Sequence, residues 1–324
     1  MIDLLLRFEP ILKEKIWGGQ KLIQLFGKDS TKKNIGESWE ISDVKGDETI
    51  VSKGILKGKS LKNLTKQYTT EFLGEKVYQK FGNEFPLLIK FIDANDKLSI
   101  QLHPDDALAK KRHNSFGKTE MWYIMQADED SKIMVGFKED SNEQEYLAHV
   151  ENKTLLELLN VDDVISGDVY FIPTGRIHAV GAGVVLAEIQ QTSDNTYRVY
   201  DWDRQDIDGN YRELHTELTK EAIDYKAINN YKTSYQVNEG GISEMVSCPH
   251  FTTNLVSFEG ELEVNHKDKD SFVIYMCVEG EVRFQYNNQE ETVKVGETIM
   301  LPACVKNVSL FATLKSKLLE VYIK

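Results

Sequence analysis

Short apolar segments bounded by Gly, Pro and Asn recur along most of the chain and predict a mainly β protein. The segments 169–172 and 184–189 are too short for helices and rich in β-branched and aromatic side chains, so both are predicted to be buried strands. Pro173 and Gly175 end the first segment, because Pro cannot donate to a strand ladder and Gly permits a sharp turn. This turn is predicted to place His178 at the start of the next strand, facing inward.

The N-terminal part of the chain adds further strands. Residues 4–12 are strand-like and lead into a predicted turn at the Trp-Gly-Gly sequence of residues 17–19. Residues 35–42 alternate with a period of two, which predicts a strand with one polar, half-solvated face. Glu37 and Glu40 lie in this strand, and a catalytic role and a solvated strand face explain them equally well.

A central strand is predicted over the apolar run 85–94, and helices are predicted around the strands. Apolar residues spaced by three or four predict helices between residues 60 and 81, packed outside a barrel. A short helix is expected to begin at residue 105 or 106. Residues 142–161 and 212–225 are also predicted to be helical.

Composition limits the class of protein. The net charge of −13 argues against a nucleic-acid or anionic-membrane partner, so an anionic substrate must be met by a local basic cluster. With 324 residues the chain is long enough for two domains, and the polar, Gly-bearing run 229–243 predicts a boundary that separates residues 1–228 from 229–324. Three cysteines without C-x-x-C spacing, no secretory signal and no apolar run of about 18 residues predict a soluble, cytoplasmic protein.

The turn that carries His178 has a specific spacing. Gly167, five residues, Pro173, one residue, Gly175, two residues and His178 fit the second sequence motif of the cupin β-barrels, and the chain resembles that family. In cupins this His is a metal ligand. Its partners come from an earlier motif built around His-x-His and a later Glu.

Upstream of the turn, the chain offers matching partners. Gln101 and His103 lie two residues apart on a strand-like run, so with Ser99 they share one face that points into the barrel, and Glu120 follows. Lys118 stands two residues before Glu120, so its ammonium would face the same site. The resemblance implies a metal site formed by Gln101, His103, Glu120 and His178. This donor set suits Zn²⁺, with Mn²⁺, Fe²⁺ or Co²⁺ as possible substitutes.

The C-terminal segment repeats part of this pattern. Gly296, five residues and Pro302 match the spacing of the first copy, but Cys304 replaces the second Gly and Asn307 stands where the His would be. No Q-x-H or H-x-H run precedes it. The repeat predicts a second cupin barrel that lacks metal ligands, with Cys304 as a core thiol rather than a nucleophile. The fold expected is therefore two jelly-roll β-barrels, with additional helices packed around the N-terminal barrel.

Several longer motifs narrow the resemblance: GESWEIS, FPLLIKFIDANDKLSIQLHPDD, GKTEMWYI, IPTGRIHA and QQTSDNTYRVYDWDR. Together they resemble the type I phosphomannose isomerases, in particular the short bacterial form, over essentially the whole chain. The resemblance implies a zinc enzyme that interconverts mannose 6-phosphate and fructose 6-phosphate through a cis-enediolate. It assigns the zinc ligands to Gln101, His103, Glu120 and His178, the active-site arginine to Arg198, the substrate-site residues to Ser99 and Lys118, proton transfer to Glu188 and the phosphate-side basic residue to Arg204. Longer members commonly carry Lys at the position of Arg204.

Some alternatives stay open at the level of sequence. Glu188 could transfer the proton or form a structural ion pair with Arg198, and a hydroxide on the zinc is the rival base. Two other functions compete with the isomerase: a metal-dependent bicupin dioxygenase, against which Gln101 in place of a His counts, and a non-enzymatic sugar-phosphate-binding bicupin. In each sugar-phosphate reading the partner is a small molecule. The chain is expected to be a monomer or a weak homo-oligomer.

Overall fold

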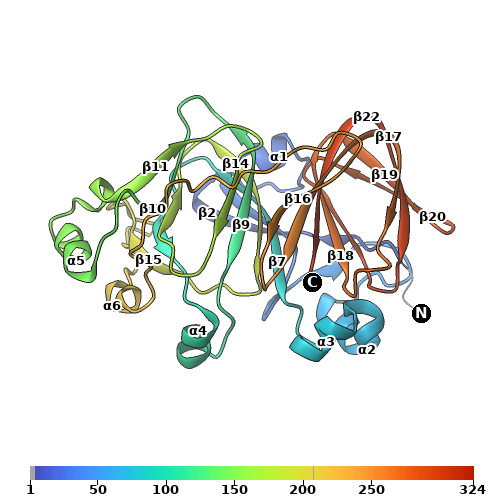
Figure 1. The fold of residues 1–324 in the computed structure, drawn as a ribbon, viewed down its shortest axis with the longest axis horizontal. Helices are drawn as coiled ribbons and strands as arrows, with labels where there is room; N and C mark the ends of the chain where they lie inside the picture. Colours follow the sequence, from blue (N-terminus) through green and yellow to red (C-terminus); the bar gives the residue numbers. More distant parts are fainter. Residues whose placement is uncertain (1–3, 207) are drawn as a thin grey trace.

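In the computed structural model, which describes residues 4–206 and 208–324, two β-barrels lie side by side (Figure 1). The predicted mainly β architecture is confirmed. A six-stranded sheet forms one wall of the first barrel in the order β12 (Val169–Ile172), β9 (Glu120–Ala127), β14 (Val184–Gln191), β7 (Leu87–Ala94), β3 (Ile35–Ile41) and β2 (Ile11–Gly19). A five-stranded sheet forms the other wall in the order β11 (Leu159–Asp163), β10 (Lys132–Phe137), β13 (His178–Val180), β8 (Ile100–Leu102) and β15 (Tyr197–Tyr200).

The second barrel is one antiparallel seven-stranded sheet. Its main path runs β16 (Gly241–Ser247), β17 (Thr252–Asn265), β22 (Asn307–Tyr322), β18 (Val273–Glu279) and β21 (Thr298–Leu301), and β19 (Glu281–Tyr286) pairs with both β22 and β20 (Gln289–Lys294). The N-terminus also reaches this barrel, because Leu6 bridges to Met300. Two small sheets pair β1 (Phe8–Glu9) with β6 (Ile50–Val51) and β4 (Asp43–Val44) with β5 (Asp47–Glu48).

Helices cover the outside of the barrels. They are α1 (Lys21–Gln24), α2 (Leu61–Leu73), α3 (Glu75–Phe81), α4 (Asp106–His113), α5 (Glu143–Glu151), the 3-10 turn η1 (Leu155–Glu157) and α6 (Thr216–Lys220). Side chains of α4, α5 and α6 pack on the outer face of the five-stranded sheet, as expected for helices around the first barrel. Helices α2 and α3 instead lie at the junction, where Phe72 O accepts a hydrogen bond from Ala303 N of the second barrel. Among the described residues, no helix combines the length and apolar character needed to cross a bilayer.

The two barrels share a large apolar core. Leu87, Ile89 and Phe91 alternate along β7 toward this core, which also contains Ile274 of the second barrel. Lys90 lies between them on the opposite face of the strand, inside the first barrel. Both faces of β7 are therefore buried, which explains why the run 85–94 is almost continuously apolar.

Two predictions for the N-terminal strands were wrong. Residues 17–19 do not form a turn but end β2, and Gly18 is needed because a Cβ there would overlap the backbone of the paired strand β3 at Gly36. The polar face of β3 is not half-solvated, because the whole strand is buried. Its acidic residues face ion-pair partners instead: Glu40 lies 2.7 Å from Lys28 Nζ, and Glu37 lies 3.3 Å from Lys15 Nζ.

Two predicted helices are shorter than expected. In the segment 142–161, α5 ends at Glu151, and Lys153 in the left-handed region (φ 58°) breaks the helix before the edge strand β11 begins. In the segment 212–225, only Thr216–Lys220 is helical. The residues before this helix are not helical, and Arg212 among them pairs with Asp201.

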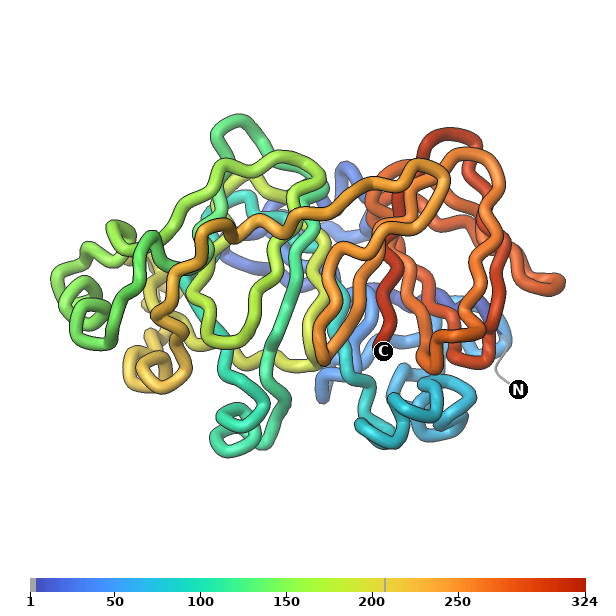
Figure 2. The backbone as a smooth tube through the Cα atoms, viewed as in Figure 1, coloured from blue at the N-terminus to red at the C-terminus, as the bar shows by residue number. Residues whose placement is uncertain are grey.

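The internal repeat is visible in the structure. Each copy begins with a glycine at positive φ, Gly167 at 93° and Gly296 at 80°, followed by a short strand that ends before the proline. His178 then begins β13 as Asn307 begins β22. Between the copies, residues 226–240 run from the first barrel toward the second without a helix or strand (Figure 2), and Tyr235 Oη donates to Gly167 O at 2.7 Å.

Candidate metal site and substrate cavity

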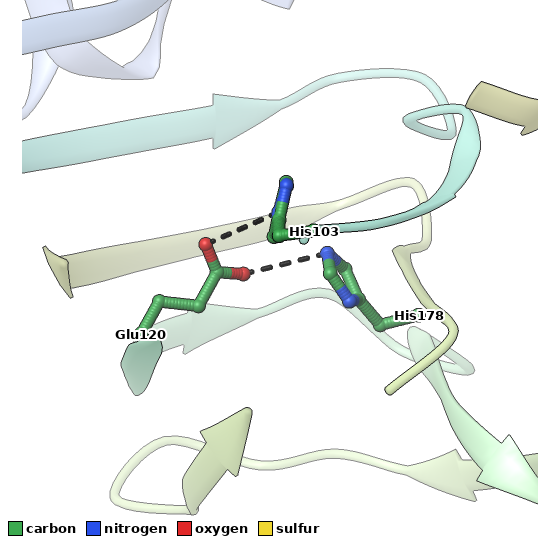
Figure 3. A group of neighbouring side chains, drawn as sticks. All are labelled: His103, Glu120 and His178. Atoms are coloured by element: carbon green, nitrogen blue, oxygen red, sulfur yellow. Dashed lines mark ion pairs between the residues drawn. The ribbon is translucent and has the colours of Figure 1, made fainter. Parts of the chain in front are cut away.

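Three buried side chains meet inside the first barrel. His103 directly follows β8, while Glu120 and His178 are the first residues of β9 and β13. The Nε2 atoms of His103 and His178 lie 3.4 Å from Glu120 Oε2 and Oε1, respectively (Figure 3). Their potential ligand atoms all lie within 4.8 Å of one another. The strand ends thus bring together residues that are widely separated in the sequence.

Hydrogen bonds orient both imidazole rings toward this centre. His103 Nδ1 lies 2.9 Å from Asn195 O, and His178 Nδ1 lies 2.9 Å from Arg176 O. A carbonyl can only accept, so Nδ1 carries the proton in each ring and the Nε2 lone pair points at Glu120. Burial lowers the pKa of His103, and it lowers the pKa of His178 to about 3. Both rings are therefore neutral near pH 7, as metal ligation requires.

The same centre lacks enough donors to satisfy its acceptors. Both oxygens of Glu120 are buried, and within residues 4–206 and 208–324 neither accepts a hydrogen bond. Burial raises the pKa of Glu120, but the ammonium of Lys118 holds it well below its usual range. Even beside Lys118, a buried carboxylate that accepts no hydrogen bond and faces two imidazole lone pairs is costly unless a further cation binds. The donor set therefore fits a divalent metal ion.

Gln101 and Lys118 border this set. Gln101 pairs with His178 across β8 and β13, and its Nε2 lies 3.4 Å from His178 Nε2. Ser99 Oγ donates to Gln101 Oε1 at 3.3 Å, and rotating the amide by half a turn would direct that oxygen at the metal position. Lys118 Nζ lies 3.0 Å from Glu120 Oε2. The structure thus brings all four sequence-predicted ligands together.

A cavity of about 290 Å³ lies beside the ligands inside the barrel. Its wall includes five of the predicted site residues: Ser99, Gln101, Lys118, Glu188 and Arg198. It also includes residues that the sequence analysis did not assign to the site: Lys15, Glu37, Lys90, Asp194, Thr196 and Arg212. Arg204 does not line it. The sequence did contain a signal for Lys90, because it is a lone charged residue within an apolar strand.

Glu188 is paired, but not with the residue considered from the sequence. Its Oε1 lies 3.0 Å from Lys90 Nζ, and its Oε2 accepts a hydrogen bond of 3.0 Å from Trp122 Nε1. Burial opposes the charge of Lys90, yet Glu188 and Glu37 together raise the pKa of Lys90 above its usual value. Burial likewise raises the pKa of Glu37, but Lys90, Lys15 and a bond from Trp39 outweigh it and lower that pKa to about 2. The cavity therefore holds fixed charges of both signs.

Two arginines pair with the buried carboxylate of Asp201 near the cavity, and a third, Arg198, lies close by. Arg212 donates from Nε to Asp201 Oδ2 at 2.6 Å and also donates from Nη2 to Oδ1. Arg204 Nη2 donates to Asp201 Oδ1 at 3.0 Å. Arg198 is held separately, by its Nη1 donating to Glu213 O at 2.9 Å. Arg198 and Arg212 thus reach the cavity wall, whereas Arg204 supports Asp201 from outside.

Comparison with known proteins agrees with this arrangement. Residues 5–131 match the model of the phosphomannose isomerase type I catalytic domain, and residues 241–319 match that of the mannose-6-phosphate isomerase cupin domain. Mannose-6-phosphate isomerase ManA of Bacillus subtilis is 33% identical over 298 residues, which cover 91% of this chain and 92% of the relative. The chain belongs to the type I mannose-6-phosphate isomerase family. The resemblance inferred from the motifs is confirmed.

Other members and structures support the family assignment and the fold. A mannose-6-phosphate isomerase of Streptococcus mutans is 33% identical over 297 residues, covering 91% of this chain and 92% of the relative. The crystal structure of the mannose 6-phosphate isomerase from Bacillus subtilis has a TM-score of 0.89 at 32% identity, with 98% of this chain and 99% of that chain covered. The apo form of the Salmonella typhimurium enzyme shares the fold, with a TM-score of 0.78 at 19% identity over 99% of each chain.

Proposed function

We propose that this chain interconverts D-mannose 6-phosphate and D-fructose 6-phosphate. One observation carries the proposal beyond family membership: the buried set His103, Glu120 and His178 contacts Lys118 and Gln101, which line the same cavity as Arg198. An aldose-ketose isomerisation needs a proton acceptor near carbon, stabilisation of negative charge and a grip on the phosphate. The cavity offers a residue for each of these tasks.

The metal in this proposal is Zn²⁺, held by His103, Glu120, His178 and the amide oxygen of Gln101. Two imidazole nitrogens and oxygen donors form a set typical of zinc, with Mn²⁺, Fe²⁺ or Co²⁺ as substitutes. When bound, the ion supplies Lewis-acid stabilisation of negative charge on the sugar oxygens. The chain's own contribution is to keep both imidazoles neutral and aimed at the site through their Nδ1 hydrogen bonds.

Glu188 is the proposed proton carrier. Its carboxylate takes the proton from C2, which leaves a cis-enediolate, and returns the proton to C1, while a second proton passes from the C2 hydroxyl to the oxygen on C1. Trp122 and Lys90 hold one oxygen of Glu188 each, so the carboxylate is fixed before the substrate enters. Because Lys90 is a buried cation, it also compensates the charge of Glu188 inside the barrel.

The remaining site residues stabilise charge and orient the sugar. Arg198 lies across from Gln101 in the pairing of β15 and β8, so its guanidinium is proposed to offset the charge of the enediolate. Lys118 reaches the same region from beside Glu120 and is proposed to contact substrate oxygen. Ser99, whose hydroxyl already bonds Gln101, is proposed to position a sugar hydroxyl.

The decisive test is a coupled assay that follows conversion of mannose 6-phosphate to fructose 6-phosphate. Chelator-stripped protein is assayed before and after Zn²⁺ is added, with bound metal measured in parallel. Activity that disappears with the metal and returns with it supports the proposal. Folded, metal-loaded protein that shows no turnover with any of the four metals would refute it.

A further inference from the structure

The three arginines around Asp201 differ in which of their donors are already used. Arg204 uses both terminal nitrogens: Nη2 bonds Asp201 at 3.0 Å and Nη1 bonds Asp96 at 3.3 Å. Its side chain therefore links the buried Asp201 to the more exposed Asp96. Unlike Arg198 and Arg212, however, Arg204 does not line the cavity beside the metal ligands.

Arg212 and Arg198 keep donors available. Arg212 uses Nε and Nη2 for Asp201, and its Nη1 has no hydrogen-bond partner among residues 4–206 and 208–324. Arg198 uses Nη1 for Glu213 O, while its buried Nε is without a partner in the described chain. Both side chains line the cavity beside the metal ligands. A guanidinium with unused donors is the group best suited to a phosphate.

The charge of this cluster also favours an anion. Arg204 and Arg212 pair with the buried carboxylate of Asp201 and Arg198 lies nearby, so the cluster keeps an excess of positive charge in a protein whose net charge is −13. The proximity of Arg212 adds to burial in lowering the pKa of Arg198, as expected for two cations held close together. A phosphate dianion bound at Arg212 would relieve this repulsion.

The backbone next to Asp201 is held in an unusual conformation. Trp202 and Asp203 follow it with φ values of 60° and 49°, a left-handed pair that costs free energy for residues other than Gly. Trp202 Nε1 donates to Leu98 O at 2.7 Å, which fixes the segment next to Ser99, just before β8. Asp201 is thus held firmly enough to position Arg212.

We propose that Arg212, positioned by Asp201, binds the substrate phosphate, and that Arg204 braces Asp201 rather than contacting phosphate. The inference rests on the proposed function and replaces the residue expected from the family resemblance. It makes Arg212 a residue that determines specificity for phosphorylated sugars, and Asp201 and Arg204 positioning residues.

The test measures phosphate affinity separately from turnover. Inorganic phosphate is titrated calorimetrically into metal-loaded wild type and into R212Q, R212K and R204Q, with R283Q on the exposed side of the second barrel as a matched control. The loss of charge-assisted bonds in R212Q is expected to weaken phosphate binding by about 10- to 100-fold and to raise KM for mannose 6-phosphate similarly. R212K keeps the charge but loses the bidentate pair with Asp201, so its phosphate affinity is expected to fall about 10-fold.

R204Q separates the two arginines. Because Arg204 only braces Asp201, its loss is expected to weaken phosphate binding by less than about threefold, and R283Q should match wild type. Wild-type phosphate affinity in R212Q, or an R204Q loss as large as that of R212Q, overturns the inference. If Arg212 governs phosphate binding but wild type has no isomerase activity, the proposed function fails and the inference stands. If the enzyme turns over but R212Q binds phosphate normally, the inference fails and the proposed function stands.

Discussion

The two barrels share a framework but differ at the positions proposed to hold metal in the first. His178 begins β13 and pairs with Gln101, and at the corresponding place Asn307 begins β22 and pairs with Asn265. In the first barrel Glu120 pairs with Ile172, the residue before Pro173. In the second barrel Val273 pairs with Leu301, the residue before Pro302. The repeat therefore preserves strand positions while the ligand chemistry is confined to one copy.

A buried glutamate, by contrast, is present in both barrels. Glu188 pairs with Lys90 on one side and Trp122 on the other, and Glu320 pairs in the same way with Asn254 and Tyr275. In each barrel the neighbours donate to the carboxylate: Trp122 Nε1 to Glu188 at 3.0 Å, and Tyr275 Oη to Glu320 at 2.8 Å.

The two glutamates differ in their surroundings: Glu320 lies in a buried network, whereas Glu188 lines the cavity. Asn254 donates to Glu320, Lys269 forms an ion pair with it, and His266 lies 3.4 Å away, so the carboxylate is enclosed by protein groups. Glu188 borders an open cavity instead. A buried glutamate at this strand position is thus compatible with the fold of both barrels. Only in the first barrel, among the residues that the structure describes, does it lie beside a cavity and a candidate metal site.

The largest predicted effect comes from giving the first barrel the residue of the second. H178N removes one imidazole ligand, so bound metal and turnover are both expected to fall to background, a loss greater than the about 10- to 100-fold typical of disturbing a ligand's supporting bond. Metal content and kcat are the measurements. N307H is the reciprocal control, and it should gain no metal because Val273 stands where Glu120 would be needed. Full metal occupancy in H178N would show that His178 is not a ligand.

The paired glutamates give the next prediction. E188Q keeps the shape of the side chain but removes the proposed proton carrier, so kcat is expected to fall by about 10²- to 10⁴-fold with metal content unchanged. E320Q is the matched variant in the second barrel and should leave kcat near the wild-type value. Steady-state kinetics on both variants decide the matter. An E188Q enzyme with more than half of wild-type kcat would make Glu188 a structural residue like Glu320.

Local spacing in the sequence was enough to predict the residues that meet at the candidate metal site. His178 follows a turn whose Gly and Pro fix the backbone over a few residues, and the alternation of a strand places Gln101 beside His103. Such features depend on neighbours in sequence, so the side chains could be assigned before the fold was known.

Residues placed by long-range contacts could not be found in this way. Lys90 is a single charged residue in an apolar run, and only the long-range pairing of β7 with β14 places it opposite Glu188. Arg212 lies in a segment with helical spacing, but its pairing with Asp201 across eleven residues holds it in irregular backbone. Arg204 was favoured from the resemblance, whereas the contacts with Asp96 that occupy it appear only in three dimensions.

A pH-dependent prediction concerns the enclosed network of the second barrel. Burial raises the pKa of Glu320, but hydrogen bonds from His266 and Asn254 and the charge of Lys269 outweigh it and lower the pKa to about 2. A depressed carboxyl pKa contributes stability above the unfolded-state value of 4.5, and this stability is lost as pH falls toward 2. The contribution is of order 3 kcal/mol.

Urea unfolding of wild type and E320Q at several pH values tests this contribution. The difference in unfolding free energy should be largest above pH 5 and should shrink steadily toward pH 3. E37Q is the matched variant in the first barrel, where the pKa is also lowered to about 2 but the side chain borders the cavity, so a smaller difference is expected. A difference for E320Q that does not change with pH would contradict the assigned pKa.

The smallest effect comes from the glycines that begin the two copies of the repeat. Both have positive φ, so replacing either with Ala is expected to cost about 1–2 kcal/mol. A Cβ at Gly167 would meet only Tyr235 Oη at 3.7 Å, whereas a Cβ at Gly296 would overlap the ring of Phe26. G296A should therefore cost about 1–3 kcal/mol more than G167A, because Phe26 must move within a packed core. Thermal unfolding of both variants measures the difference, and equal melting temperatures would show that the ring shifts freely.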